Sequence, residues 1–408
     1  MRRGSNLHAL GGFNQTVVFD TIRRAADGLS RVEIAQKTGL SAQTVSNVSR
    51  RLLNSCVIRE AGLQNLGVGK PRTILQLDPA GHFAIGVHID PAVITYVLLN
   101  IRGEVIAHQA AHTPSAANPE AVITAMRDSI DTLITSSGVE RDRVLGVGIA
   151  SPGPIDVERG IVLDPPLLTN WHGVALRREL QKATGFFVLL EKDVTAAAVA
   201  ELWKNREHER DDFLFFYYGT GVGAGLVLGG EAVRGPTSNA GDVGHIVVDS
   251  TGPLCRCGRI GCLGDAVSPE AIVRIAIAQG LVDANPDLLD TATISGCLTR
   301  LAVLAGSGET AAIELLEGTA RHFASAIVTL ANLVDLNLIV FGGPYWAAVS
   351  RFMLARLPQL VNESASLVTT RTVVIATSDI GDDVAAVGAA CLVLDATLTP
   401  RSSTLYIS

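Results

Sequence analysis

The stretch Gly241–Ser268 reads GDVGHIVVDSTGPLCRCGRIGCLGDAVS and contains a dense set of candidate metal ligands. They are His245, Cys255, Cys257 and Cys262, with nine residues between the histidine and the first cysteine, then one and then four between successive cysteines. Thiolate and imidazole ligands in a set of four suit tetrahedral Zn²⁺ and leave no open position for catalysis. The alternative is a group of buried thiols beside an unrelated histidine. The spacing predicts a structural zinc ion that fixes this loop.

Length and composition are those of a cytoplasmic protein. The 408 residues are enough for two or three domains, and 48% hydrophobic residues can fill their cores. The start of the sequence has no pattern of a secretory signal, and no uninterrupted apolar run reaches the length of about 18 residues needed for a membrane span. Clustered cysteines in such a chain indicate a reducing compartment and metal binding rather than disulfides.

Charge is unevenly distributed along the chain. Residues 1–80 contain 11 Lys and Arg against 5 Asp and Glu, whereas the remainder contains 22 against 35. A basic segment on an acidic body is typical of a nucleic-acid-binding unit. A solvated basic face is the alternative, and charge alone does not decide between them.

The first eighty residues carry the helix signals of a helix-turn-helix. Apolar residues at helical spacing predict a first helix over 14–26. Ser30 and Glu33 form a capping box and Gly39 is a natural stop, which together predict a second helix. Ser41 is a suitable N-cap for a third helix, AQTVSNVSRRLL. In a helix-turn-helix this last helix enters the major groove of DNA.

Two strands after the third helix, CVIREAG and PRTILQLD, predict a hairpin wing with a basic tip that suits a narrow minor groove. The residues expected to contact DNA are Ser41, Gln43, Thr44, Ser46, Asn47, Arg50, Lys70 and Arg72. The alternative is a small helical bundle that packs on the body. The amide-rich outer face of the third helix favours DNA readout, and we expect a winged helix-turn-helix domain over residues 1–80.

From residue 81 the chain alternates strands and helices in two halves, which predicts two α/β lobes around a cleft. The first lobe is expected over 81–204, completed by a C-terminal helix at about 383–398. The second lobe, over 205–382, is expected to carry the zinc site and an oligomerisation surface. The glycines of Gly219–Gly225 follow a strand and could offer N–H groups to phosphate, although such hairpins often only turn.

The order of these motifs resembles the ROK family, named for repressor, open reading frame and kinase. The sequence GTGVGAG is followed by GDVGH, CRCGRIGCL and FGG, and the likeness covers essentially the whole chain. The resemblance implies an actin-like, ribonuclease H-like sugar-kinase fold in two lobes, a structural zinc, and assembly as a homodimer or homotetramer. The helix-turn-helix and the GKP wing look like those of the family's transcriptional repressors, which control sugar-related genes.

The family's kinases hold ATP phosphates with an Asp-x-Gly-Gly-Thr loop, whose counterpart here is His88–Ala92. The motif aspartate is His88, and the glycine pair is Asp90 and Pro91, which add a negative charge and remove an N–H. The resemblance therefore implies that this chain is not an enzyme. Asp193 matches the kinases' catalytic base and is expected to be vestigial.

The family's sugar-contacting positions also differ. Lys192 replaces an asparagine, while Asp242 and Gly264 replace glutamates. Lys192 could hold an anionic ligand such as a sugar phosphate or a sugar acid, or could pair with an aspartate in a vestigial cleft. The resemblance implies a ligand site formed by Ser151, Gly153, Asn170, Lys192, Asp193, Asp242 and His245.

These observations predict a DNA-binding transcriptional regulator, in most such proteins a repressor, of carbohydrate-related genes. We expect it to bind double-stranded operator DNA and to be gated by a sugar or sugar derivative in a degenerate kinase cleft. The alternatives are an ATP-dependent sugar kinase with an appended DNA-binding head, and a zinc-stabilised DNA-binding scaffold without an effector.

Overall fold

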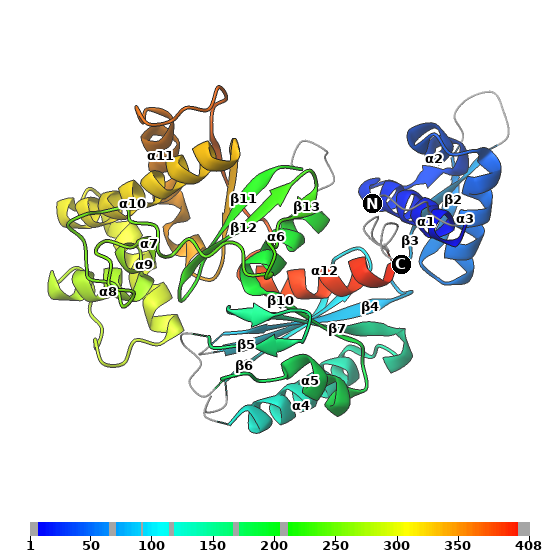
Figure 1. The fold of residues 1–408 in the computed structure, drawn as a ribbon, viewed down its shortest axis with the longest axis horizontal. Helices are drawn as coiled ribbons and strands as arrows, with labels where there is room; N and C mark the ends of the chain where they lie inside the picture. The colour runs from blue at the N-terminus through cyan, green and yellow to red at the C-terminus, as the bar shows by residue number, and fades with distance from the viewer. Residues whose placement is uncertain are drawn as a thin grey trace.

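A computed structural model shows a small N-terminal unit beside a body of two α/β lobes (Figure 1). The structure describes residues 7–64, 71–90, 93–113, 118–165, 171–204 and 211–398. Within these ranges no helix combines the length and the apolar character that crossing a membrane requires.

The N-terminal unit packs helices against a small antiparallel sheet of order β1-β3-β2. Its elements are α1 (Leu7–Arg24), β1 (Leu29–Ser30), α2 (Arg31–Thr38), α3 (Ala42–Asn54), β2 (Ile58–Gln64) and β3 (Arg72–Leu77). Helix α1 begins well before residue 14, where the sequence pattern placed its start. Gly11 and Gly12, which are weak helix formers, obscured its first turns.

The turn between α2 and α3 is set by local capping. Ser30 N–H donates to Glu33 Oε2 at 2.8 Å, which completes the predicted capping box at the start of α2. Gly39 ends α2 with a φ of 69°, a left-handed conformation that glycine adopts without a steric cost. Ser41 Oγ then accepts a hydrogen bond from Thr44 N–H at 3.1 Å and starts α3. The caps fix the angle at which α3 leaves α2.

The first lobe is a mixed sheet of order β10-β7-β4-β5-β6, in which β10, β7 and β4 are parallel and β5 and β6 are antiparallel to their neighbours. Its strands are β4 (Phe83–Ile89), β5 (Val93–Asn100), β6 (Val105–His112), β7 (Val144–Ser151) and β10 (Val188–Lys192), with β8 (Ile155–Asp156) and β9 (Ile161–Val162) as a separate pair. Its helices are α4 (Pro119–Ser137), η1 (Arg141–Arg143), α5 (Leu176–Thr184) and α6 (Asp193–Lys204).

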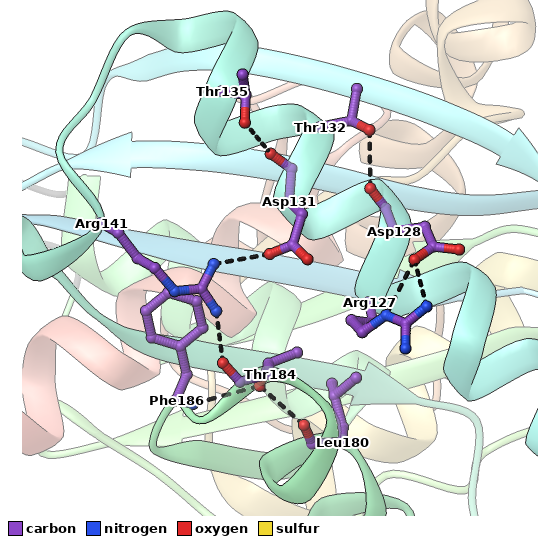
Figure 2. A network of polar contacts seen from close by, with 9 residues as sticks. All are labelled: Arg127, Asp128, Asp131, Thr132, Thr135, Arg141, Leu180, Thr184 and Phe186. Atoms are coloured by element: carbon purple, nitrogen blue, oxygen red, sulfur yellow. Dashed lines mark hydrogen bonds and ion pairs between the residues drawn. The ribbon is translucent and has the colours of Figure 1, made fainter.

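Helices α4 and α5 cover the outer face of this sheet (Figure 1). Arg141 joins them, as Figure 2 shows: its guanidinium pairs with Asp131 of α4 at 2.7 Å and donates to the main-chain oxygen of Thr184 at the end of α5. The same guanidinium lies 4.3 Å from the centre of the Phe186 ring. These contacts join α4 to α5 in the outer layer of the first lobe.

The second lobe has a sheet of order β13-β12-β11-β14-β15, in which β11, β14 and β15 are parallel. Its strands are β11 (Phe213–Tyr218), β12 (Val222–Leu228), β13 (Glu231–Ala232), β14 (Leu338–Gly342) and β15 (Val374–Thr377). Its helices are α7 (Leu263–Ala266), α8 (Pro269–Ala278), α9 (Thr291–Gly306), α10 (Thr310–Val334) and α11 (Trp346–Asn362). The core beneath the sheet is aromatic, with Phe341 stacked on Trp346 at a centroid distance of 4.2 Å.

The last helix, α12 (Val384–Leu398), returns to the first lobe and packs on β4, β7 and α6. The contact with α6 is made by backbone: a Cβ built on Gly388 would lie 1.7 Å from the carbonyl oxygen of Ala196. Gly86 of β4 is equally close to Ala386, since a Cβ there would lie 1.8 Å from that residue's oxygen. Glycine at both positions lets α6, α12 and the sheet approach without intervening side chains, which fixes α6 in place.

The N-terminal unit rests on the far end of α6. Phe19 and Trp203 have ring centroids 6.3 Å apart, and the Arg23 guanidinium lies 4.7 Å from the Trp203 ring centre. Arg23 also donates a hydrogen bond to the Trp203 main-chain oxygen. Arg102 of the first lobe donates to the Leu77 main-chain oxygen at 3.2 Å. The small unit therefore contacts the body through both α1 and β3.

Candidate ligand cleft and metal centre

A cavity of about 330 Å³ lies where the two lobes meet. Its walls come from the end of β4, the loop after β7, the β10–α6 junction, the β11–β12 turn, the segment after β13 and the cysteine-rich loop. The lining residues are His88, Asp90, Pro152, Gly153, Pro154, Pro165, Lys192, Asp193, Val194, Tyr217, Thr220, Gly221, Val222, Gly223, Asn239, Gly241, Asp242 and Arg256. This volume falls near the lower end of the range for small-molecule sites, roughly 300–1,000 Å³.

The loop at the end of β4 and the β11–β12 turn face each other across the cleft and are joined by a hydrogen bond. Thr220 Oγ1, in the β11–β12 turn, donates a hydrogen bond to Asp90 Oδ2, at the end of β4, at 3.0 Å. Behind Asp90, the buried ring of His88 packs edge-on against Tyr217 with centroids 5.9 Å apart. Burial lowers the pKa of His88, while the nearby carboxyl groups of Asp193 and Asp90 act in the opposite direction. The carboxylate of Asp90 faces the β11–β12 turn through its hydrogen bond with Thr220.

Asp193 starts α6 and lines the cleft beside Lys192. Burial raises the pKa of Asp193, while the neighbouring His88 and a hydrogen bond from Val194 N–H to Asp193 Oδ1, 2.7 Å long, act in the opposite direction. The carboxyl group is therefore held at the start of a helix, next to a histidine, with one oxygen committed to the backbone.

Lys192 ends β10 and is only 8% exposed. Its Nζ donates to the main-chain oxygens of Asn239 and Ala240, each at 3.2 Å. The neighbouring buried acid, Glu191, pairs with Arg234 at 2.6 Å. The Lys192 ammonium is thus held by carbonyl dipoles rather than by a carboxylate.

Asn239 connects the lobes at a second point. Its Oδ1 accepts a hydrogen bond from Ile155 N–H and its Nδ2 donates to Ile155 O, both at 2.8 Å. This pair fixes the loop that carries Gly153 against the second lobe. A Cβ on Gly153 would lie 3.2 Å from Lys192 Cε, so the loop and the lysine stem are already in close contact.

Only some of the expected ligand residues line the cavity. Gly153, Lys192, Asp193 and Asp242 line the cavity. Ser151 and His245 are absent from its walls. Ser151 is fully buried, and its hydroxyl donates to the main-chain oxygen of Pro152 at 3.2 Å. His245 instead faces the cysteines.

Asn170 and Pro91 fall outside the described residues. The sequence reasoning did not single out Thr220, Asn239 or Arg256 as wall residues of the cleft. The position of Arg256 could have been noticed from the sequence, because it lies between Cys255 and Cys257 of the proposed metal loop.

The metal-ligand candidates do come together. The ligand atoms of His245, Cys255, Cys257 and Cys262 all lie within 4.8 Å of one another. His245 Nδ1 is 3.6 Å from Cys255 Sγ, and Cys257 Sγ is 3.6 Å from Cys262 Sγ. Three sulfur atoms and one imidazole nitrogen at this separation could hold one metal ion.

The backbone around this cluster is tight. Gly261 has a φ of 73°, and a Cβ there would lie 1.4 Å from the Asp249 oxygen. Only glycine fits this approach, which brings Cys262 back beneath the first two cysteines. The loop thus has a shape that a bound ion would complete.

Most of the predicted DNA-contacting residues belong to α3. On α3, Ser41, Gln43, Asn47 and Arg50 are exposed, and Thr44 and Ser46 are half-buried. Gln43 Nε2 donates to Asn47 Oδ1 at 3.2 Å, so these amides lie one turn apart on the same face.

The opposite face of α3 carries Val45, Val48 and Leu52, which are buried in the core of the unit. Arg72, at the start of β3, is half-buried, and Lys70 lies outside the described residues. The polar side of α3 is therefore free for a partner while its apolar side is occupied.

Comparison with known proteins places the fold. The chain is 25% identical to the xylose repressor of Caldicellulosiruptor bescii, over 90% of this chain and 92% of that protein. A crystal structure of a ROK family transcriptional regulator, a homolog of the E. coli MLC protein, superimposes with a TM-score of 0.78 at 25% identity and covers 96% of this chain and 97% of its own.

A ROK family glucokinase from Streptomyces griseus, in complex with glucose and AMPPNP, matches with a TM-score of 0.60 at 26% identity. That match covers 76% of this chain and 98% of the glucokinase. The profile of the ROK family matches residues 84–396, which is most of the chain. The resemblance inferred from the motifs is confirmed: this chain belongs to the ROK family.

Proposed function

We propose that this protein is a transcriptional repressor of carbohydrate-related genes that binds operator DNA and is gated by a sugar or a sugar derivative. The observation that carries the proposal is the N-terminal unit, whose α3 exposes amide and guanidinium groups beside a β2–β3 hairpin. Support comes from the likeness to a xylose repressor over nearly the full length of both chains. The glucokinase match leaves about a quarter of this chain uncovered.

The N-terminal unit acts in this proposal as a winged helix-turn-helix. Helix α3 would enter the major groove, where Gln43 and Asn47 can pair bidentately with adenine and Arg50 can reach guanine or phosphate. The β2–β3 hairpin would be the wing, with Arg72 near its tip and Lys70 completing its charge. The polar face of α3 would supply sequence readout and the arginines the affinity that depends on salt.

A sugar kinase with an appended DNA-binding head is the alternative, and the cleft argues against it. Asp90 occupies a position where the kinase loop has glycine, and it is hydrogen-bonded to Thr220 of the facing turn. An ATP phosphate there would meet a carboxylate and would have to break this cross-lobe bond. We therefore propose that the cleft binds a ligand without transferring phosphate.

Ligand gating would act through α6. This helix of 12 residues is about 18 Å long. Asp193 lies at its cleft end and Trp203 near its other end, beneath the N-terminal unit. Its backbone packs closely on α12, where a Cβ on Gly388 would lie 1.7 Å from the Ala196 oxygen. A ligand that favours one spacing of the lobes would shift the α6 end and the N-terminal unit on it, by no more than its differential affinity for the two states allows.

We further propose that the metal held by the cysteine cluster is Zn²⁺, in a closed structural site with no part in chemistry. The units would be residues 1–80, 81–204 with the last helix, and 205–382, and the protein would work in the cytoplasm. A homodimer or homotetramer, formed through the second lobe, would present paired α3 helices to two half-sites one DNA turn apart.

The test is selection of genomic fragments on the purified protein, followed by gel-shift titration of the recovered promoter. We expect a saturable, sequence-dependent complex that weakens when the cognate sugar is added. Failure to bind any duplex at low salt would refute the regulatory proposal. ADP release on a common hexose at a rate typical of kinases would support the alternative.

A further inference from the structure

Lys192 is a buried cation that forms no ion pair with a carboxylate in the part of the chain that the structure describes. Among the described residues, no Asp or Glu oxygen lies within the 4.0 Å ion-pair distance of its Nζ. Moving an ammonium group out of water costs several kcal/mol unless charge or strong hydrogen bonds compensate it. Two carbonyl oxygens at 3.2 Å compensate part of that cost and leave the third N–H of the ammonium unassigned.

The acids nearest in sequence are committed elsewhere. Glu191 accepts from Arg234 through Oε2 at 2.6 Å and from the Lys192 main-chain N–H through Oε1 at 3.1 Å. Asp193 accepts from Val194 N–H at 2.7 Å. The pairing of Lys192 with an adjacent aspartate, which would make the cleft vestigial, is therefore not the arrangement in this structure.

A second cation reaches the same cavity from the other lobe. Arg256 lines the cavity wall, is exposed, and lies between Cys255 and Cys257 in the sequence. Its guanidinium offers two parallel N–H groups in the geometry that suits carboxylate and phosphate. Gly153 adds a main-chain edge without a side chain beside the Lys192 stem.

Three acidic residues also line the cavity, and they differ in their hydrogen-bond partners. Asp90 is bonded to Thr220 and Asp193 to the start of α6, while Asp242 is exposed at the wall. Carboxylates in such positions accept hydrogen bonds from hydroxyl groups. The cavity thus provides two kinds of group: carboxylates that suit the hydroxyl groups of a sugar ring, and two cationic side chains, Lys192 and Arg256, on its walls.

From this arrangement we infer that the ligand of the cleft is a sugar that carries an anionic group, a phosphate or a carboxylate, bound by Lys192 and Arg256. This inference rests on the proposed function, since it names the class of ligand for the same cleft. The anionic group of the ligand would neutralise the buried ammonium of Lys192, and the hydroxyl groups of the sugar would face Asp242. Lys192 is then the residue that sets specificity against neutral sugars.

Calorimetric titration of the full chain tests the inference with glucose and xylose as neutral probes, and glucose 6-phosphate and glucuronate as anionic ones. We expect at least one anionic probe to bind at least tenfold tighter than either neutral sugar. The two anionic probes separate phosphate from carboxylate recognition. Inorganic phosphate alone should compete only weakly, because it lacks the hydroxyl contacts.

Lys192→Met keeps the length of the buried stem and removes the charge, and should reduce the preference for the anionic probe at least tenfold. Lys182→Met, at an exposed position of α5 outside the cavity, is the matched control and should bind like the wild type. Arg256→Gln, in an exposed loop position, provides a second test if Lys192→Met does not fold.

Equal or tighter binding of neutral sugars, no binding of either anionic probe, or an unchanged preference in both cleft variants would overturn the inference. Promoter binding measured without sugar reports on the proposed function separately. A protein that binds its promoter but prefers neutral sugars would refute only the anionic ligand.

Discussion

Thr220 Oγ1 and Asp90 Oδ2 are 3.0 Å apart, and their hydrogen bond joins the two lobes at the loop that we propose is a degenerate phosphate site. We therefore predict that the protein neither binds ATP with appreciable affinity nor releases ADP on hexoses. Asp90→Ala removes the charge and should raise the affinity for AMPPNP, measured by calorimetry, without producing turnover. Strong nucleotide binding by the wild type would contradict this account of the cleft.

The α3 surface gives the second prediction. Asn47→Ala removes a candidate base contact and should weaken binding to the selected promoter by about 1–3 kcal/mol, with little change on unrelated duplex DNA. Gln181→Ala, which removes an exposed amide on α5 of the first lobe, serves as the matched control. Gel-shift titration on both duplexes measures the effect. Equal weakening on both would assign Asn47 to phosphate contact rather than readout.

Features that depend on local sequence could be predicted. The capping box of Ser30 and Glu33 and the cysteine cluster follow from spacing alone, because caps and ligand loops bring together residues that are close in the chain. The contact of Asp90 with Thr220 could not, since 130 residues separate them and each looks ordinary in its own segment.

The placement of the ligand residues shows the same limit. Ser151 and Lys192 are register partners on parallel strands, yet only Lys192 lines the cavity. Which side chain faces a cleft depends on the packing of both lobes and on the loops between them. His245 was expected to serve both the metal and the ligand; its Nδ1 lies 3.6 Å from Cys255 Sγ, and it does not line the cavity in this structure.

Metal removal provides the third prediction. We expect about one zinc per chain by elemental analysis, because four soft ligands converge on one point. Cys257→Ser should lose the metal and lower the melting temperature by several degrees, since metal binding contributes directly to folding. Cys297→Ser, a buried cysteine on α9 outside the cluster, should keep full metal content. Retained zinc in Cys257→Ser would exclude Cys257 from the ligand set.

The ion pair between α10 and α11 should give a pH-dependent stability. Arg356 donates to both oxygens of Glu317, at 2.7 and 2.8 Å, and these hydrogen bonds hold the pKa of Glu317 below its usual value. A depressed pKa contributes stability above the unfolded-state pKa of about 4.3 that is lost as pH falls through the folded-state value. Because solvent screens the pair, the contribution is expected to stay below about 1 kcal/mol.

Thermal melts of wild type and Arg356→Met across the acid range test this. The variant should melt lower near neutral pH, and the difference should shrink as the solution is acidified below the pKa of Glu317. Arg274→Met, in an exposed pair on α8, should show a smaller difference at every pH. If the difference in melting temperature between wild type and Arg356→Met stays constant with pH, packing of the Arg356 stem, and not its charge, supports the two helices.

The contact of Arg23 and Phe19 with Trp203 is the link by which, in the proposed mechanism, the cleft acts on DNA. Trp203→Ala removes the ring that Arg23 and Phe19 contact, at a position that does not line the cleft. We predict that the variant binds ligand and promoter separately as the wild type does, but that the ligand changes its promoter affinity much less.

Phe187→Ala, an exposed aromatic position outside the cleft and the contact, controls for loss of apolar surface. Promoter titration with and without ligand gives the coupling free energy directly. If the coupling in Trp203→Ala equals that of the wild type, α6 does not transmit the signal, and the lobes must act on DNA through the assembly of subunits instead.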